Sequence, residues 1–170
     1  MGEMMATEPA KLTKTNTPIK LKRLVQCAIL DLIWASIATV VAIVLNLPAR
    51  FGGSTRSLPV VQDFLYGMGT ALGPPLVWMV ASALLIWLAW NQRNRWSILG
   101  VIGITLFGAI EVIGALGEPI TYELLNPVTS NLLLAVIQAG NIIIPLAMMI
   151  FGIREWGRRR SETSQKQNAP

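Results

Sequence analysis

The sequence predicts an all-α integral membrane protein, a bundle of four transmembrane helices with both termini in the cytoplasm. The class follows from composition, because the 170-residue chain is 53% hydrophobic and has a mean hydropathy of +0.54. One soluble domain of this length cannot bury so much apolar surface. The helix number follows from four separate apolar runs, and the orientation from the uneven placement of Lys and Arg beside them.

The first apolar run, residues 24–47, is the clearest predicted span and contains a single charged residue, Asp31. At about 1.5 Å rise per residue, a helix of this length crosses a hydrocarbon core of roughly 30 Å. Residues 1–22 are polar and predict a disordered cytoplasmic tail. After Pro48 the chain is mixed, and residues 58–68 (LPVVQDFLYGM) predict a short helix on the outer interface.

The second span is predicted over about residues 71–90, beginning near either Thr70 or Leu76, with Pro74 and Pro75 in its first turn, where proline is tolerated. The third is predicted over residues 97–116. Tryptophan and arginine alternate in the short loop between these spans, which is typical of a membrane face.

The fourth span is predicted over residues 132–153, with Pro145 inside it, and it follows a loop that contains Glu118 and Glu123 but no Lys or Arg. Residues 154–170 are basic and then polar, which predicts a disordered cytoplasmic tail. Residues 23–153 therefore make up one transmembrane domain.

Lys and Arg number five before the first span, two in the first loop, two in the second, none in the third and five after the fourth. By the positive-inside rule, this distribution places both termini in the cytoplasm. Short loops and the lack of N-x-S/T sequons favour a bacterial inner membrane. The net charge of +5 is then a topology signal, and we expect no nucleic-acid partner.

Several kinds of chemistry are excluded by residue usage. The chain has no histidine, which excludes Ser-His-Asp catalysis and His-ligated haem or zinc, and its single cysteine, Cys27, cannot form an internal disulfide. No nucleotide-binding loop is present. We therefore expect no cofactor, no metal and no enzymatic activity.

Four polar residues within the predicted spans need an explanation, because lipid penalises them: Asp31, Glu111, Gln138 and Asn141. An ionised carboxylate at the centre of a bilayer costs about 2.5 to 3.5 kcal/mol on insertion scales, so each acid must face protein or water or be protonated. Asp31 lies about 12 Å from the inner end of its predicted helix and Glu111 about 21 Å from the start of its own. We expect their depths to differ by several ångströms, which argues against direct cooperation as an acid–base pair.

Small residues share the helix faces of these acids. At 100° per residue, one face of the third span combines Glu111 with glycines, and one face of the first combines Asp31 with alanines. Rows of small residues let helices approach closely, so we expect these faces to pack. The predicted packing residues are Gly100, Gly103, Gly108, Gly114, Ala35, Ala38 and Ala42.

The function stays open between two main hypotheses. A third, a membrane-embedded enzyme acting on lipid with Asp31 and Glu111 as its acid–base pair, is disfavoured by the expected difference in their depths. The first is a small multi-pass protein without catalysis that acts as a structural or accessory subunit, with Glu111 protonated and hydrogen-bonded to Gln138 or a backbone carbonyl. The second is a proton- or cation-coupled transporter with Glu111 as the proton carrier. Because helices packed through glycine and alanine leave little lumen, we expect such a path to need a second copy. The predicted partners are the lipid bilayer and either further copies or a membrane subunit.

Overall fold

The protein is all-helical throughout the part described by a computed structural model, which covers residues 19–50, 59–90, 96–124 and 131–167. Six helices form within these ranges, and the only extended pairing among them consists of isolated bridges around Thr70. The helices are α1 (Ile19–Val44), α2 (Val60–Tyr66), α3 (Leu76–Trp90), α4 (Ser97–Gly117), α5 (Pro119–Leu124) and α6 (Leu132–Gln167).

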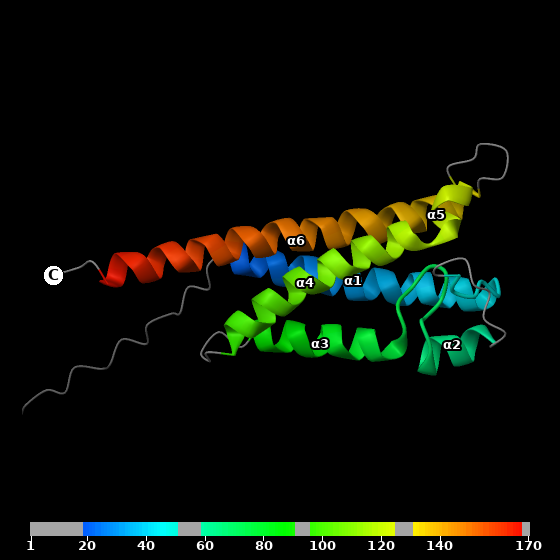
Figure 1. Cartoon of the computed structure of the whole chain (residues 1–170), viewed down its shortest axis with the longest axis horizontal. Coiled ribbons are helices and arrows are strands. Elements are labelled where there is room, and N and C mark those ends of the chain that lie inside the picture. The colour runs from blue at the N-terminus through cyan, green and yellow to red at the C-terminus, as the bar shows by residue number, and fades with distance from the viewer. Residues whose placement is uncertain (1–18, 51–58, 91–95, 125–130, 168–170) are drawn as a thin grey trace, which may run out of the picture.

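The four longer helices lie along one another and contact in a ring (Figure 1). α6 packs against α1 and α4, and α3 packs against the same two helices, so α1 and α4 occupy opposite corners. The short helices α2 and α5 lie together at one end of the molecule, here called the α2/α5 end. The opposite end carries Arg23, Arg154 and Arg158 and is called the basic end.

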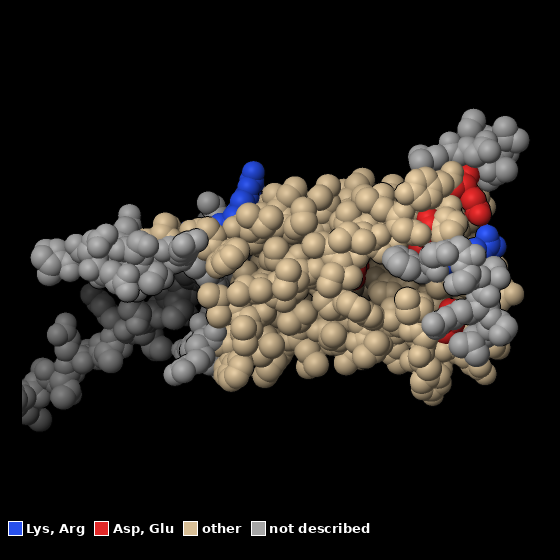
Figure 2. All heavy atoms as spheres, viewed as in Figure 1, with Lys and Arg blue, Asp and Glu red and all other residues tan. Residues whose placement is uncertain are grey.

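Three helical stretches are long and apolar enough to span a membrane, namely Arg23–Val44, Ser97–Gly117 and Leu132–Arg158. Their outward faces carry large exposed apolar side chains such as Ile113, Val44 and Leu132. In Figure 2 the body between the charged ends is almost entirely uncharged, except for some red at the edge of a hollow. These features are compatible with a membrane protein.

The second predicted span, residues 71–90, is wrong over residues 71–75, because α3 begins only at Leu76. Pro74 and Pro75 lack the amide hydrogens of a helix interior, and proline biases the residue before it away from helical geometry. A turn replaces the helix, with the Thr70 amide donating to the Gly73 carbonyl at 2.8 Å. α3 has 15 residues and is about 22 Å long, shorter than a hydrocarbon core of roughly 30 Å.

The end of α1 also differs from the prediction of a span to residue 47, because the helix stops at Val44. Asn46 adopts a positive φ of 52°, and the Leu47 amide donates to the Ala42 carbonyl at 2.8 Å. This pattern is a Schellman cap, in which asparagine tolerates the left-handed conformation better than most residues. The chain then turns back, and the Leu47 carbonyl accepts from the Ala71 amide at 3.2 Å.

Both predicted tails are partly helical. α1 already begins at Ile19, and α6 continues through residues 154–167, which were expected to be disordered. The long apolar part of α6 provides a helix that can simply propagate, and Arg158 and Glu155 join successive turns through an ion pair at 2.7 Å. Residues 1–18 and 168–170 lie outside the described chain, so the tail prediction there is untested.

The helices α2 and α5 both occur in predicted loops. α2 forms within the stretch 58–68 that predicts a short helix, whereas α5, Pro119–Leu124, was not anticipated. Asn131, at the start of α6, caps it by accepting from the Leu133 amide at 3.0 Å.

Two buried apolar clusters lie on either side of the middle of the bundle. The cluster at the basic end joins α1, α3, α4 and α6, and its buried residues are Leu24, Val25, Ala28, Ile86, Ala89, Val101, Ile104 and Met148. The cluster at the α2/α5 end consists of Ala38, Ala42, Ala71, Leu72, Ile120 and Ile137. Ala71 and Leu72 of the second cluster also line the cavity that holds the candidate site.

Candidate functional site

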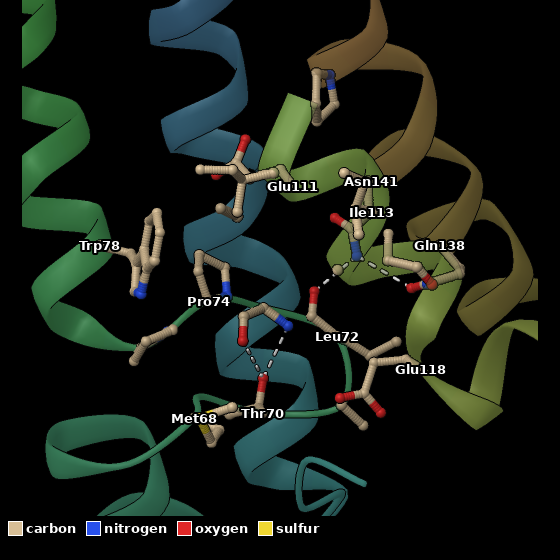
Figure 3. A pocket seen from close by; sticks show the side chains of 18 of the residues that line it. Met68, Thr70, Leu72, Pro74, Trp78, Glu111, Ile113, Glu118, Gln138 and Asn141 are labelled. Carbon is tan, nitrogen blue, oxygen red and sulfur yellow. Dashed lines mark hydrogen bonds between the residues drawn. The ribbon is translucent and has the colours of Figure 1, made fainter. Parts of the chain in front are cut away.

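A cavity of about 340 Å³ opens inside this single chain, between the ring of long helices and the segment 67–75. All four polar residues singled out from the sequence, Asp31, Glu111, Gln138 and Asn141, line it. Figure 3 shows Glu111, Gln138 and Asn141 on the wall opposite Trp78. The volume falls at the lower end of the range of small-molecule pockets, about 300 to 1,000 Å³.

The carboxyl groups of Asp31 and Glu111 lie within hydrogen-bonding reach of one another across the centre of the ring. Asp31 is only 5% exposed, and the Oε2 atom of Glu111 is buried without an N–H or O–H donor among the described residues. Two carboxyl oxygens can form a hydrogen bond only when one of them carries a proton. Two acids so placed can hold one proton between them, which is the basis of the function proposed below.

The two acids meet because their helices start at the same end of the molecule (Figure 1). α1 begins at Ile19, so Asp31 lies about 18 Å along its helix, while Glu111 lies about 21 Å along α4. The expected difference of several ångströms in depth assumed a later start for the first helix. The expected separation in depth is therefore wrong, because both acids line the same cavity.

Gln138 and Asn141 form a second polar group on α6 rather than bonding to Glu111. The Gln138 side-chain amide donates to Thr121 Oγ1 at 2.6 Å and to the Ala115 carbonyl at 3.0 Å. The Asn141 amide donates to Gln138 Oε1 at 3.2 Å and to the Leu72 carbonyl at 2.7 Å. These bonds attach α6 to α4, α5 and the segment 67–75. They do not include the carboxyl groups of Asp31 and Glu111.

The segment 67–75 forms a non-helical wall of the cavity at a level where a helix was expected. Its Leu72 carbonyl is satisfied by Asn141, and Thr70 exchanges hydrogen bonds with Gly73 (Figure 3). Gly73 sits so close to α1 that an added Cβ would collide with Thr39 Oγ1. Irregular backbone at such a depth is tolerated when it is buried in protein or lines a cavity.

Most of the predicted packing residues lie at helix contacts. An added Cβ at Gly100 or Gly103 would collide with Ala89 or Leu85 of α3, and one at Gly108 would meet the Pro145 carbonyl of α6 at 2.6 Å. Ala38 and Ala42 are fully buried, and Ala35 is 8% exposed and lines the cavity. Gly114 differs from this expectation, because it has nothing within 4 Å of its Cβ position and lines the cavity.

Glu118 lies on the cavity wall toward the α2/α5 end, and it was not among the residues predicted for the site. Its Oε2 accepts a hydrogen bond from the Arg50 amide at 3.2 Å, and the Arg50 guanidinium pairs with Glu123 at the same distance. Burial raises the pKa of the Glu118 carboxyl, and the nearby Arg50 only opposes this shift. Sequence spacing contains no signal for this contact, because it depends on the fold of two loops.

Trp78 is the second unanticipated residue of the site. It comes from α3, lines the cavity and packs against Phe107 of α4 in a tilted arrangement, with ring centroids 4.7 Å apart and an interplanar angle of 52°. Glycine and proline clusters at 67–69 and 73–75 are the sequence signal that would have placed a non-helical wall beside it.

The charge of the site is one-sided. Its ionisable lining residues in the described chain are Asp31, Glu111 and Glu118, with no Lys or Arg among them. The described residues also hold no group of three His, Cys, Asp or Glu side chains placed to bind a metal ion.

Comparison with known proteins gives no relative from which a role can be transferred. No protein-family model, no curated protein and no solved structure matches the chain. The functional assignment therefore rests on the geometry of the cavity.

Proposed function

We propose that this chain is a proton-linked membrane transport protein whose Asp31–Glu111 pair binds and releases the transported proton. The observation that carries the proposal is the contact between these two buried carboxyls on the wall of a cavity. Acids inside a membrane are costly, and the usual reason for keeping them is an ion or proton path. The proposal does not include catalysis.

The same proposal covers topology. α1, α3, α4 and α6 cross the bilayer as a four-helix bundle, and α3 reaches full depth together with the segment 67–75. Arg23, Arg154 and Arg158 lie on the cytoplasmic side by the positive-inside rule. The cell membrane of a bacterium remains the proposed location, and both termini lie inside.

Access to the pair is from the α2/α5 end. Cavity-lining residues such as Thr70 and Glu118 continue in that direction, whereas the apolar cluster around Leu24, Ile104 and Met148 fills the bundle toward the basic end. A continuous pore is thus not part of the proposal. Transport requires a second conformation in which the basic-end cluster separates, as in alternating access.

The cavity lies within one chain, so proton binding does not need a second copy. The expectation of a small lumen failed because the segment 67–75 takes the place of a helix at one corner and leaves room behind it. A homo-oligomer or a partner subunit remains a proposal for the exposed apolar faces.

A structural or accessory role is the second candidate, and the filled basic-end cluster favours it. In that case the shared proton forms a permanent hydrogen bond that holds α1 against α4. The two candidates differ in whether the proton exchanges with solvent during function.

Proton flux in proteoliposomes separates them. Under an imposed pH gradient, the native chain should move protons, and Glu111→Gln should abolish the flux while keeping side-chain shape. Glu123→Gln is the matched control, because Glu123 is an exposed carboxylate paired with Arg50 outside the cavity lining. Equal flux in all three folded proteins would refute the transport proposal and leave the accessory role. Absence of flux in all three would do the same when the exchanged solute is also supplied.

A further inference from the structure

The cavity combines acidic and apolar surfaces in a way that selects its ligand. We propose that it binds an organic cation with an apolar body, which exchanges for the proton of the Asp31–Glu111 pair. This inference rests on the proposed proton-binding function and adds the class of ligand.

Charge excludes the other organic classes. Three carboxyl groups, those of Asp31, Glu111 and Glu118, face the cavity without a Lys or Arg in its described lining. One of their oxygens, Glu111 Oε2, is buried and has no N–H or O–H donor in the described chain. An anion would meet only repulsion here, while a cation supplies the positive charge that the pair lacks once its proton leaves.

The walls favour an organic cation over a metal ion. Apolar surface is contributed by Trp78, Pro74, Pro75 and Ile110. The Trp78 ring packs against Phe107. Metal cations such as calcium require about six to eight oxygen ligands, and the described residues hold no cluster that approaches this set. An organic cation needs one carboxylate and contact with an aromatic face or apolar surface.

The rim indicates how such a ligand enters. Met68, Ile110 and Ile113 line the cavity and are 52%, 47% and 66% exposed, so the opening between α4 and the segment 67–75 is apolar. This opening faces the surface that lipid would cover, which suits a hydrophobic cation already dissolved in the bilayer. The exchange is balanced: one cation pairs with the carboxylate and one proton leaves to water.

The test compares two ions of the same shape and opposite charge on the purified full-length protein in neutral detergent. Equilibrium dialysis should show saturable binding of tetraphenylphosphonium, or of the smaller benzyltrimethylammonium, and none of tetraphenylborate, with protein-free micelles as the blank. Glu111→Gln should weaken binding of the cation at least tenfold. Ile113→Trp, which fills the rim without touching an acid, should weaken it too, and Glu123→Gln should leave it unchanged.

Each outcome is decisive. Equal binding of the borate, binding unaffected by both Glu111→Gln and Ile113→Trp, or binding of neither cation would overturn the proposed ligand class. The proposed ligand class and the proposed proton function can fail separately. Measuring the pH of an unbuffered solution during cation binding shows whether protons are released, and so tells the two failures apart. Cation binding without release would support the ligand class and refute proton coupling. An Asp31–Glu111 pair that takes up and releases a proton but binds no cation would support the proton-binding function and refute the ligand class.

Discussion

The axial position of a buried residue is only as reliable as the assigned start of its helix. Asp31 and Glu111 were identified from the sequence as costly acids on small-residue faces, and that reasoning needed no neighbour. Their contact could not be predicted, because α1 begins at Ile19 and its first turns are too polar to be recognised as part of a span. Which side chain opposes which depends on these offsets and on the order of helices around the ring.

The side-chain amide of Asn141 donates a hydrogen bond to the backbone carbonyl of Leu72, so we assign Asn141 a structural role. Replacing it with alanine leaves the Leu72 carbonyl without its 2.7 Å donor. Hydrogen bonds between helices in membranes contribute about 0.6 kcal/mol on average and up to about 1.7 kcal/mol. We expect Asn141→Ala to destabilise the protein by about 1 kcal/mol in reversible unfolding in mixed micelles.

Ser36→Ala serves as its control, since Ser36 bonds only to the Leu32 carbonyl of its own helix. Equal stability of the two variants would mean that the Asn141–Leu72 bond does not hold the segment 67–75 in place.

At the scale of elements, the apolar runs predicted the long helices well and the interruptions poorly. Ser97 begins α4 and Leu132 begins α6 as expected, because both follow short polar loops. Residues 71–75 were wrongly assigned to a span, because their apolar composition was given more weight than the glycine and prolines among them. An apolar composition indicates that a segment is buried or faces lipid. Its prolines and glycines indicate whether its backbone can be helical.

The glycines of α4 provide a paired test of helix contact. Gly100→Ala places a methyl group against backbone atoms of Ala89, and we expect it to cost about 1 to 3 kcal/mol of stability. Gly114→Ala meets open space and gains helix propensity, so we expect a change between zero and about 1 kcal/mol of stabilisation. Unfolding of both variants in the same detergent measures the difference. Similar losses at the two positions would contradict the assigned contact between α3 and α4.

For the whole molecule, charge separation is the feature that sequence and structure share. The basic end carries Arg23, Arg154 and Arg158, while acidic side chains gather near the α2/α5 end (Figure 2). The placement of Lys and Arg along the chain predicted this asymmetry. The ring of helices collects most of each class at one end, with Arg50 at the α2/α5 end and Glu155 at the basic end as exceptions. The cavity was not predictable, because it depends on the mismatch between a short α3 and its longer neighbours.

Single-cysteine labelling tests the proposed orientation. In a Cys27→Ala background, Tyr66→Cys and Ser161→Cys place thiols at exposed positions in α2 and in the C-terminal part of α6. On intact cells, a membrane-impermeant maleimide should label position 66 and should reach position 161 only after the cells are opened. The opposite pattern would invert the topology, and labelling of both would disprove that the bundle separates the two ends.

Infrared spectroscopy of the carboxyl groups at neutral pH tests whether Asp31 and Glu111 share a proton. We expect a protonated carboxylic acid in the native protein that disappears in Glu111→Gln, since the remaining Asp31 carboxylate can then accept from the new amide. Glu123→Gln should retain it. Absence of any protonated acid in the native protein, or a band that survives Asp31→Asn combined with Glu111→Gln, would contradict the shared proton.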